Sequence, residues 1–582
     1  MSTIQPPPRK KLEWVLRPVS EPVAVSALAK QLNDLPEALA RALFLRGVRT
    51  FDDARLFFRG SRAALHAPGN MAGLDQAVGR VVSAIRSRER VVVYGDYDVD
   101  GTTSTAMVTH FLRERGVPAT FFIPDRLRHG YGMCNAGVDE ALNMGASLLI
   151  ALDCGVTAHQ EVSYANARGL DVVICDHHTP LDTLPTAIAV LNPKRSDCAY
   201  PFNELCGCGV AFKLLHAVSE ALDEDPGTVD QYLDLVALAT AADVVPLRGE
   251  NRILLREGIG RLRQKPRLGI RTLAEQANVR LSECDTRAIQ FGLAPRINAA
   301  GRLGDAKRAV RLLLTDDETE ALARARQLER INADRRALDK QVLETARQRA
   351  EAWLDAGHES IVLHDDSWHL GVLGIVAARL VDRLHRPAVL LGSVNGVAKG
   401  SARSIDSVNV YQALNACADL LQSFGGHDYA AGLALAPADV HAFAERFDQA
   451  VRQATTVGSF TKRLDVDAEV DVNAIDHRFW AVLEQFAPFG AENAPPVFVS
   501  RGLRVAGPPR CLGKNSNHLK FRVAQGDSAS REVIGFGLAD RYEVVADAVS
   551  QRSPVDIAYE VTENVWNGVR SLQLNLRDVR PG

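Results

Sequence analysis

Three short apolar runs in the first half of the chain are each followed within two residues by an aspartate. The runs are VVVY from Val91, SLLIAL from Ser147 and DVVIC from Asp171, and amphipathic stretches separate them. Together with TFFI from Thr120 they alternate as strand and helix, which is typical of βαβ units in a mainly parallel, doubly wound sheet. Because the carboxyl ends of parallel strands form the ligand crevice of such a sheet, the sequence predicts that these acids share one site.

The densest acidic cluster is the segment GDYDVDGTTS, which begins at Gly95. It places Asp96, Asp98 and Asp100 at alternate positions. Three converging carboxylates repel one another unless a cation neutralises them. The same pattern can open an EF-hand calcium loop, but that loop needs a preceding helix and a glutamate at its twelfth position, where this chain has Met107. An acidic turn with a purely structural role is the other alternative.

Further candidate ligands follow the later runs. Asp153 follows the second run, Asp176 with His177 and His178 follows the third, and Asp243 lies beyond an apolar helix-like stretch. One such residue alone is more often a helix cap or a satisfied core group. Carboxylates combined with imidazoles, without paired thiolates, suit Mg²⁺ or Mn²⁺ better than structural zinc. Two such ions can activate water and neutralise a phosphoryl group, so the pattern indicates phosphoester hydrolysis.

The rest of the chain divides into further segments. No proline or glycine stands between Thr315 and Leu354, and Glu318 three residues after Thr315 predicts a capping box at the start of one very long connector helix. A second α/β pattern follows with the strands IVLH and PAVLL, and short strands with turn signals then predict an all-β barrel such as an OB-fold. The expected domains are an N-terminal segment (1–70), the site-bearing α/β domain (71–250), a helical region with the connector helix (251–357), a second α/β domain (358–455) and the barrel (460–582).

In chain order, GDYDVDG, LDCG, CDHH and ALATAADVVPL resemble the four motifs of the DHH phosphoesterase superfamily. Six further segments resemble those of the RecJ family within it, in the same order: PDRLRHGYG, GCGVAFKLL, LAPRINAAGRLGDA, WHLGVLGIVAARL, KGSARSI and FGGHDYAAGL. The similarity extends over roughly residues 40 to 580. Two departures are visible, Cys154 where asparagine is common and Cys208 where valine is common, and neither removes a candidate ligand.

The resemblance implies roles for the acidic and imidazole groups. Asp176 would orient the imidazole that follows it, and His178 would contact the scissile phosphate or protonate the leaving oxygen. Asp153 is suited to bridge two ions, and Asp96 would be a supporting acid. The implied ligands of two divalent metal ions, Mn²⁺ or Mg²⁺, are Asp96, Asp98, Asp100, Asp153, His177 and Asp243.

The same resemblance implies a pocket for the 5′-phosphate of the substrate. In KGSARS, hydroxyl groups and an arginine fork can cradle an anion, whereas a polar turn with a solvated arginine is the alternative for this motif taken alone. On the barrel, a groove for single strands is expected from Lys514, His518, Lys520, Arg522 and Phe521, with an ordinary barrel core and polar rim as the alternative. The implied substrate-binding residues are Arg126, Arg302, Gly400, Ser401, Arg403, Ser404, Gly425, Gly426 and His427.

The resemblance leads us to expect a metal-dependent 5′-to-3′ exonuclease that degrades single-stranded DNA to 5′-mononucleotides in recombination and repair. A formal net charge of −3 requires any polyanion site to be local, and nine scattered cysteines without framework spacing indicate a cytoplasmic protein. We expect a monomer without membrane contact, with single-strand-binding protein and a helicase as partners. The alternatives are a DHH phosphodiesterase acting on short oligoribonucleotides or cyclic dinucleotides, and an inactive DHH replication scaffold, which would lack metal ligands that this chain retains.

Overall fold

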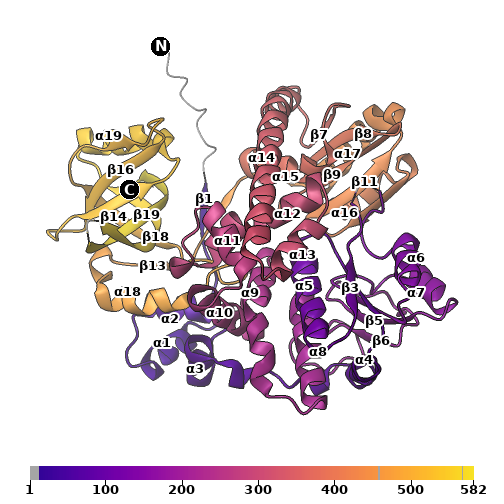
Figure 1. Cartoon of the computed structure of the whole chain (residues 1–582). Coiled ribbons are helices and arrows are strands. Elements are labelled where there is room, and N and C mark those ends of the chain that lie inside the picture. The colour runs from indigo at the N-terminus through magenta and orange to yellow at the C-terminus, as the bar shows by residue number, and fades with distance from the viewer. Residues whose placement is uncertain (1–11, 127, 457–458, 567) are drawn as a thin grey trace. The chain divides into compact units, whose positions relative to one another are not determined.

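The computed structural model describes residues 12–126, 128–456, 459–566 and 568–582. The chain divides into two compact units, one of His66–Val245 with Leu254–Phe460 and one of Met1–Leu65 with Pro246–Ile253 and Thr461–Gly582. In Figure 1 the first unit contains two α/β layers and a long helix, and the second contains helices and a barrel. In the described ranges, no helix is long and apolar enough to cross a membrane.

The first sheet has five parallel strands in the order β3-β2-β4-β5-β6. The central strands β2, β4 and β5 are almost wholly buried, as is typical of a parallel sheet covered on both faces, and they confirm the predicted strand runs. Helices α6 and α7 pack on one face through Val138 and Val162. The strands are β2 (Val91–Gly95), β3 (Ala119–Phe122), β4 (Leu148–Leu152), β5 (Asp171–Cys175) and β6 (Ala189–Leu191), and the helices are α4 (Leu74–Ser87), α5 (Val99–Glu114), α6 (Asn135–Asn143), α7 (His159–Asn166), α8 (Gly207–Ala221) and α9 (Leu233–Ala242).

The predicted connector is helix α14 (Glu318–Asp355), which has 38 residues. Its N-cap is Asp317, whose side chain accepts a hydrogen bond of 2.6 Å from the amide of Glu320. The capping box predicted at Thr315 is therefore wrong, because the nearer carboxylate takes the free amide and Thr315 Oγ1 donates to the Glu320 carboxylate instead. The other helices of this region are α10 (Gly249–Gln264), α11 (Leu268–Gln276), a π-helix (Ala288–Leu293), α12 (Ala294–Leu303) and α13 (Lys307–Leu314).

The second sheet has five strands in the order β10-β11-β9-β8-β7, and only β7 and β8 pair in parallel. The predicted strands IVLH and PAVLL are confirmed as β7 and β8. The elements are β7 (Ile361–His364), α15 (Leu370–Leu384), β8 (Ala388–Val394), β9 (Val397–Arg403), α16 (Val410–Asn415), β10 (Ser423–Gly426), β11 (Ala430–Leu435) and α17 (Val440–Ala454).

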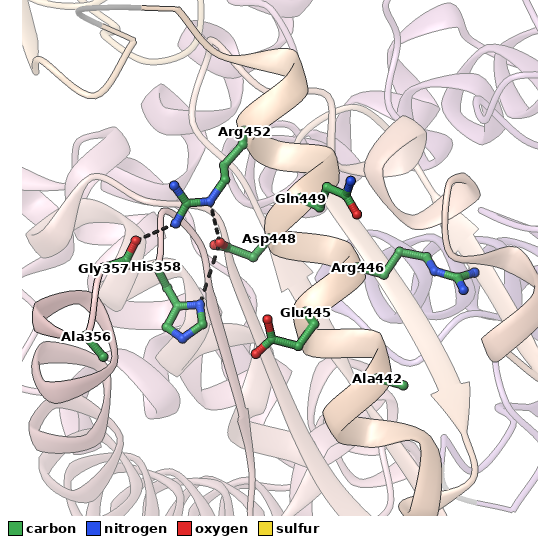
Figure 2. Close-up of a pocket in the computed structure, with 9 residues that line it drawn as sticks. All are labelled: Ala356, Gly357, His358, Ala442, Glu445, Arg446, Asp448, Gln449 and Arg452. Carbon is green, nitrogen blue, oxygen red and sulfur yellow. Dashed lines mark hydrogen bonds and ion pairs between the residues drawn. The ribbon is translucent and has the colours of Figure 1, made fainter.

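A pocket of 490 Å³ lies beside α17 and the end of α14 (Figure 2). Several of its polar groups pair with one another. Asp448 accepts hydrogen bonds from the Ser360 amide (2.7 Å) and from Nε of Arg452 (2.8 Å), and Arg452 also donates to the carbonyl of Gly357. The pocket contains none of the predicted site residues, and its network ties α17 to the start of β7.

The second unit joins the two ends of the chain. Strand β1 (Glu13–Leu16) pairs in parallel with β12 (Arg463–Val466), and Leu39 and Leu43 of α2 share one core with Phe498 and Tyr559 of the barrel. The helices are α1 (Pro22–Gln31), α2 (Glu37–Phe44), α3 (Phe51–Arg59), α18 (His477–Leu483) and α19 (Tyr542–Gln551).

The all-β barrel predicted in this unit is confirmed as a seven-stranded sheet in the order β13-β14-β18-β19-β17-β16-β15, with β14 also paired to β16. This extra pairing closes the sheet on itself. The strands are β13 (Ala468–Glu469), β14 (Phe498–Val505), β15 (Arg510–Leu512), β16 (His518–Ala524), β17 (Arg531–Gly535), β18 (Val555–Trp566) and β19 (Val569–Pro581).

Candidate active site

The groups predicted to bind metal lie together at the carboxyl ends of β2, β4 and β5. Three sets of side chains each bring their ligand atoms within 4.8 Å of one another: Asp96, Asp98 and Asp153; Asp100, His177 and Asp243; and Asp153, His177 and His178. Asp153 and His177 each belong to two sets. The structure therefore brings every predicted ligand into one cluster.

Asp100 is fixed by the first turn of α8. Its two carboxylate oxygens accept hydrogen bonds from the backbone amides of Gly207 (2.6 Å) and Cys208 (2.7 Å). The positive N-terminal end of a helix favours a charged carboxylate. A side chain does not fit at Gly207, because its Cβ would lie 2.8 Å from Oδ1 of Asp153. The segment GCGVAFKLL thus positions two candidate ligands at once.

Helix α12 holds the acidic turn from the other side. Asp98 caps α5 by accepting a hydrogen bond of 3.1 Å from the Gly101 amide. The next amide, that of Val99, donates to Oδ1 of Asn298 at 3.1 Å. Asn298 lies in the motif LAPRINAAGRLGDA, but sequence reasoning did not single it out, since only its fold-dependent contact reveals its role.

Burial and mutual repulsion disfavour ionisation of the carboxyl groups. Burial raises the pKa of Asp153, and the charges of Asp100 and Asp98 raise it further. Burial is also the main cause that raises the pKa of Asp96 and of Asp243, and the charge of a neighbouring aspartate is the second cause in each case. A cluster of this kind is stable as carboxylates only with a cation among them.

The pKa of Asp100 and that of His177 show how the surroundings tune single groups. Burial and the charge of Asp98 raise the pKa of Asp100 to about 6, although the amides of Cys208 and Gly207 oppose the rise. Burial, helped by the charge of His178, lowers the pKa of His177 to about 3. The His177 ring is therefore neutral near pH 7, which is the form that ligates metals.

Several of these ligand atoms have no other partner. In the part of the chain that the structure describes, Oδ1 of Asp96, Oδ1 of Asp153 and both ring nitrogens of His177 form no hydrogen bond. A buried polar atom without a partner costs about 1–3 kcal/mol, so a group of them in one place needs an explanation. Carboxylate oxygens with an imidazole nitrogen suit Mn²⁺ or Mg²⁺, and the residues present fit such ions.

Asp176 orients His178 and not the ring of His177. Its Oδ1 accepts hydrogen bonds from Nδ1 of His178 (2.7 Å) and from the His177 amide (2.7 Å), and its Oδ2 accepts one from the Val156 amide (2.9 Å). Burial disfavours the charge on both groups, but their hydrogen bond lowers the pKa of Asp176 to about 2 and raises that of His178. The hydroxyl of Tyr131 lies 3.0 Å from Nε2 of His178. Sequence reasoning missed Tyr131, although it stands in the motif PDRLRHGYG.

Backbone strain coincides with two of the candidate ligands. Asp153 has a φ of 60°, and Val244, directly after Asp243, also has a φ of 60°. Non-glycine residues in this left-handed region cost about 1–3 kcal/mol, and such residues cluster at functional sites. For Val244 the cost is high because its side chain is β-branched.

Three predicted substrate-binding arginines lie near one another in the same unit. Burial lowers the pKa of Arg302 to about 10, and the charges of Arg126, Arg335 and Arg403 lower it further. Burial and the charge of Arg126 also lower the pKa of Arg403. Within the described residues, no carboxylate forms an ion pair with Arg126, Arg302 or Arg403. Arg302 and Arg403 are half-buried and Arg126 is exposed, so three positive charges without a carboxylate partner among the described residues gather where a ligand can reach them, which suits an anionic ligand.

Lys399–Arg403 of the motif KGSARS lie in strand β9 and Ser404 follows it, so the motif differs from an open phosphate loop. Gly400 is needed by the sheet, because a Cβ there would collide with the carbonyl of Leu390 on β8. Oγ of Ser401 accepts a hydrogen bond of 2.8 Å from Nη1 of Arg403, and the Ser404 hydroxyl donates to the Val408 carbonyl at 2.6 Å. The hydroxyl groups of Ser401 and Ser404 thus already form hydrogen bonds within the protein.

The glycines and histidine of FGGH lie on the next strands of this sheet. Gly425 and Gly426 are on β10, which pairs with β11, and Ala430 of β11 pairs with Arg403. His427 is in the exposed turn between the two strands. This register brings the turn to the end of β9 that carries Arg403, although among the described residues His427 and Arg403 form no hydrogen bond with each other.

On the barrel, the expectation that Phe521 lines a surface groove is wrong. Phe521 is buried in the core, because β16 alternates and turns Leu519, Phe521 and Val523 inward. Among the barrel side chains that the structure describes, Phe536 has an exposed aromatic ring, which contacts His518 edge-on with ring centroids 5.4 Å apart. Lys520 pairs with Glu532 at 2.8 Å, so its charge is partly used within the barrel.

Three family models match the chain. The DHH family, N-terminal domain, matches residues 90–240, the DHHA1 domain matches 357–453, and the RecJ OB domain matches 466–578. These ranges contain, in order, the acidic cluster with the first sheet, the second sheet, and the barrel.

Full-length relatives and solved structures agree with these matches. A single-stranded-DNA-specific exonuclease RecJ from Bacillus subtilis is 37% identical over 573 residues, which is 98% of this chain and 71% of the relative. The crystal structure of RecJ in complex with Mn²⁺ from Thermus thermophilus superposes with a TM-score of 0.81 at 32% identity and covers 98% of this chain and 79% of that one. The complex of the same protein with Mg²⁺ gives a TM-score of 0.74 at 30% identity, with 98% and 78% covered.

Proposed function

Because the chain belongs to the RecJ family of DHH phosphoesterases, we propose that it is a metal-dependent exonuclease that degrades single-stranded DNA from its 5′ end to 5′-mononucleotides. One observation carries the proposal. Asp96, Asp98 and Asp153 bring their ligand atoms within 4.8 Å of one another, and Arg302 lies close enough to this cluster for the charge of Asp98 to act on its pKa. A metal cluster beside unpaired arginines suits a phosphodiester with a charged terminal phosphate.

The metal ligands of this proposal are Asp96, Asp98, Asp100, Asp153, His177 and Asp243, and relatives with Mn²⁺ and Mg²⁺ support the choice of ion. Two divalent ions at these residues would make water more acidic and neutralise charge on the phosphoryl group. Asp100 and Asp98 keep their positions through the amides of Gly207, Cys208 and Gly101. This preorganisation lowers the cost of bringing the carboxylates together.

His178 is the proposed proton donor or phosphate contact. Its Nδ1 donates to Asp176, which leaves Nε2 facing the Tyr131 hydroxyl at 3.0 Å. A histidine held in this way by a carboxylate keeps its proton more readily, because the pKa of His178 is raised. A protonated ring at this position can hydrogen-bond to a phosphate oxygen or protonate the leaving oxygen.

The terminal phosphate is assigned to the arginines. Arg126, Arg302 and Arg403 would bind it together with Ser401, and Gly400, Ser404, Gly425, Gly426 and His427 would complete the surrounding surface. A terminal phosphate carries more charge than an internal diester, so these groups would fix the end of the strand and thereby the scissile bond. The 5′ polarity of the proposal rests on this pocket.

We assign the barrel to the downstream strand, as its match to the RecJ OB domain supports. We further assign the enzyme to recombination and repair in the cytoplasm, as a monomer that works with single-strand-binding protein and a helicase. The DHH phosphodiesterase and the inactive scaffold are not favoured, because the similarity to RecJ relatives covers 98% of the chain and every candidate ligand is retained.

The proposal is tested by digestion of end-labelled substrates with Mn²⁺. A 5′-labelled single strand should release its label as a mononucleotide from the first turnover, whereas a 3′-labelled strand should shorten progressively. Blunt duplex DNA and RNA of the same sequence should be cut at a small fraction of this rate. Release of the 3′ label first, or equal rates on duplex, would contradict the proposal.

A further inference from the structure

Gly374 stands inside helix α15, where alanine would favour the helix. A glycine kept inside a helix at this cost normally has a reason in packing or in function. An ideal Cβ at Gly374 would lie 2.9 Å from Nη2 and 3.6 Å from Cζ of Arg403, and 3.1 Å from Oγ of Ser401. The guanidinium of Arg403 therefore rests on the bare backbone of α15.

Other contacts fix the guanidinium on its remaining sides. Nη1 of Arg403 donates to Oγ of Ser401 at 2.8 Å and to the carbonyl of Ala402 at 2.7 Å. These two bonds and the surface of α15 define one position for the side chain. Since no ion pair to a carboxylate occurs in the described residues, no opposite charge determines this position.

A methyl group at Gly374 would displace Arg403 but not the fold. The atoms that it meets are the far end of a flexible side chain and a serine hydroxyl, both of which can move at small cost. The backbone of α15 has no such conflict. The substitution should therefore stabilise the helix and at the same time move the guanidinium.

From this geometry we infer that Gly374 is a positioning residue, which sets the Arg403 guanidinium and through it the preference for a 5′-phosphate. The inference rests on the proposed function, because it needs Arg403 to bind the terminal phosphate. Gly374 touches no substrate in this scheme. The methyl group would also meet Oγ of Ser401, which is hydrogen-bonded to the same guanidinium, so its effect passes through the joined Arg403–Ser401 pair, and this gives the inference a specific signature.

That signature is non-additivity. If Gly374 acts only through Arg403, Gly374→Ala should cost nothing further once the guanidinium is gone. The same should hold with Arg403→Lys, since lysine has no Nη2 to collide with the new methyl group. A general packing defect in α15 would instead add to either variant.

The experiment measures kcat and KM on 5′-phosphorylated and 5′-hydroxyl single strands with Mn²⁺. The variants are Gly374→Ala, Arg403→Ala, Arg403→Lys and both double variants. The control is Gly79→Ala, since Gly79 is an exposed position within α4 and has nothing within 4 Å of its ideal Cβ. All folds are checked by the thermal midpoint of the full chain.

We expect Gly374→Ala to lower the phosphate-over-hydroxyl ratio of kcat/KM about tenfold, mainly through KM, because one charge-assisted contact is weakened. The thermal midpoint of Gly374→Ala should stay the same or rise by about 2 °C. Gly79→Ala should change the midpoint in the same way but leave the phosphate-over-hydroxyl ratio unchanged. Each double variant should match its Arg403 parent.

A normal ratio in Gly374→Ala together with a lowered ratio in Arg403→Ala would overturn this inference alone, as would additive losses in the double variants. A normal ratio in Arg403→Ala would overturn the proposed phosphate pocket itself.

Discussion

Oδ1 of Asp153 lies 3.2 Å from Nε2 of His177, and in the described residues neither atom forms a hydrogen bond. An aspartate and a histidine at this separation would normally form an ion pair. Burial opposes this by disfavouring the charged form of each group, since it raises the pKa of Asp153 and lowers that of His177 to about 3. The pair is arranged as two ligands facing a common cation.

Asp153→Asn should therefore abolish cleavage, by at least about 1000-fold, since several kcal/mol of charge stabilisation are lost. Asparagine tolerates the left-handed backbone at this position, so the fold should persist. Mn²⁺ should raise the thermal midpoint of the parent, and this rise should be smaller in the variant. Asp182→Asn, at an exposed position, is the control. Near-parental turnover of Asp153→Asn with Mn²⁺ would contradict the assignment.

The part of the site that lies at the ends of the parallel strands could be predicted from the sequence. Asp153 and Asp176 follow buried apolar runs, and the parallel pairing of β4 and β5 brings the two strand ends together. Hydrophobic pattern and one topological rule are enough for that inference. The choice of ring at Asp176 was not predictable, because it depends on side-chain rotamers after the strand. The sequence DHH offers both rings equally.

Contacts between segments that are far apart in the chain also could not be predicted from the sequence. The pairing of β1 with β12 joins Trp14 to Leu464, and no local pattern signals a partner so far along the chain. The inward direction of Phe521, in contrast, was readable, because Leu519, Phe521 and Val523 alternate with polar residues in β16.

The barrel can be tested without truncation. Ending the chain near Arg463 would unpair β1 and expose the core that α2 shares with the barrel, so point variants are cleaner. Arg510 and Lys514 are exposed. The double variant Arg510→Ala, Lys514→Ala should weaken binding to long single strands and reduce the salt slope by about 0.7 for each lost phosphate contact. Fluorescence anisotropy at several salt concentrations measures this, and an unchanged slope would remove these residues from the strand's path.

Asp339 should be a strong stability determinant of α14. Its carboxylate is buried and pairs with Arg335 at 3.2 Å and with Arg379 at 3.1 Å. Asp339→Ala leaves two arginines without this partner and should destabilise the larger unit by about 3 kcal/mol. Glu351→Ala breaks a more exposed pair with Arg347 on the same helix and should cost less than about 0.5 kcal/mol. Equal urea midpoints for the two variants would show that the buried pair has no special weight.

Asp448 should make the stability of the second α/β domain dependent on pH. Burial opposes its ionisation, but hydrogen bonds from Ser360, Arg452 and the Glu359 amide outweigh this and hold its pKa below the usual value. A carboxyl group whose folded pKa is lowered stabilises the fold above its unfolded pKa of about 3.9, and this contribution is lost as the pH falls through the folded value.

Asp448→Asn should therefore lower the free energy of unfolding at pH 7 by about 1–3 kcal/mol, and the gap to the parent should narrow below about pH 4. Trp353, which stacks on His358 with ring centroids 4.0 Å apart, reports on this region by fluorescence. Urea midpoints, not intensities, should be compared, because the stacked His358 ring can change the indole fluorescence without unfolding. The amide side chain of the Asp448→Asn variant does not ionise. Acidification therefore removes the stabilisation by the ionised Asp448 carboxylate from the parent only. If the difference in free energy of unfolding between the parent and Asp448→Asn stayed constant from pH 7 to pH 3.5, Asp448 would stabilise the domain by packing and not by its charge.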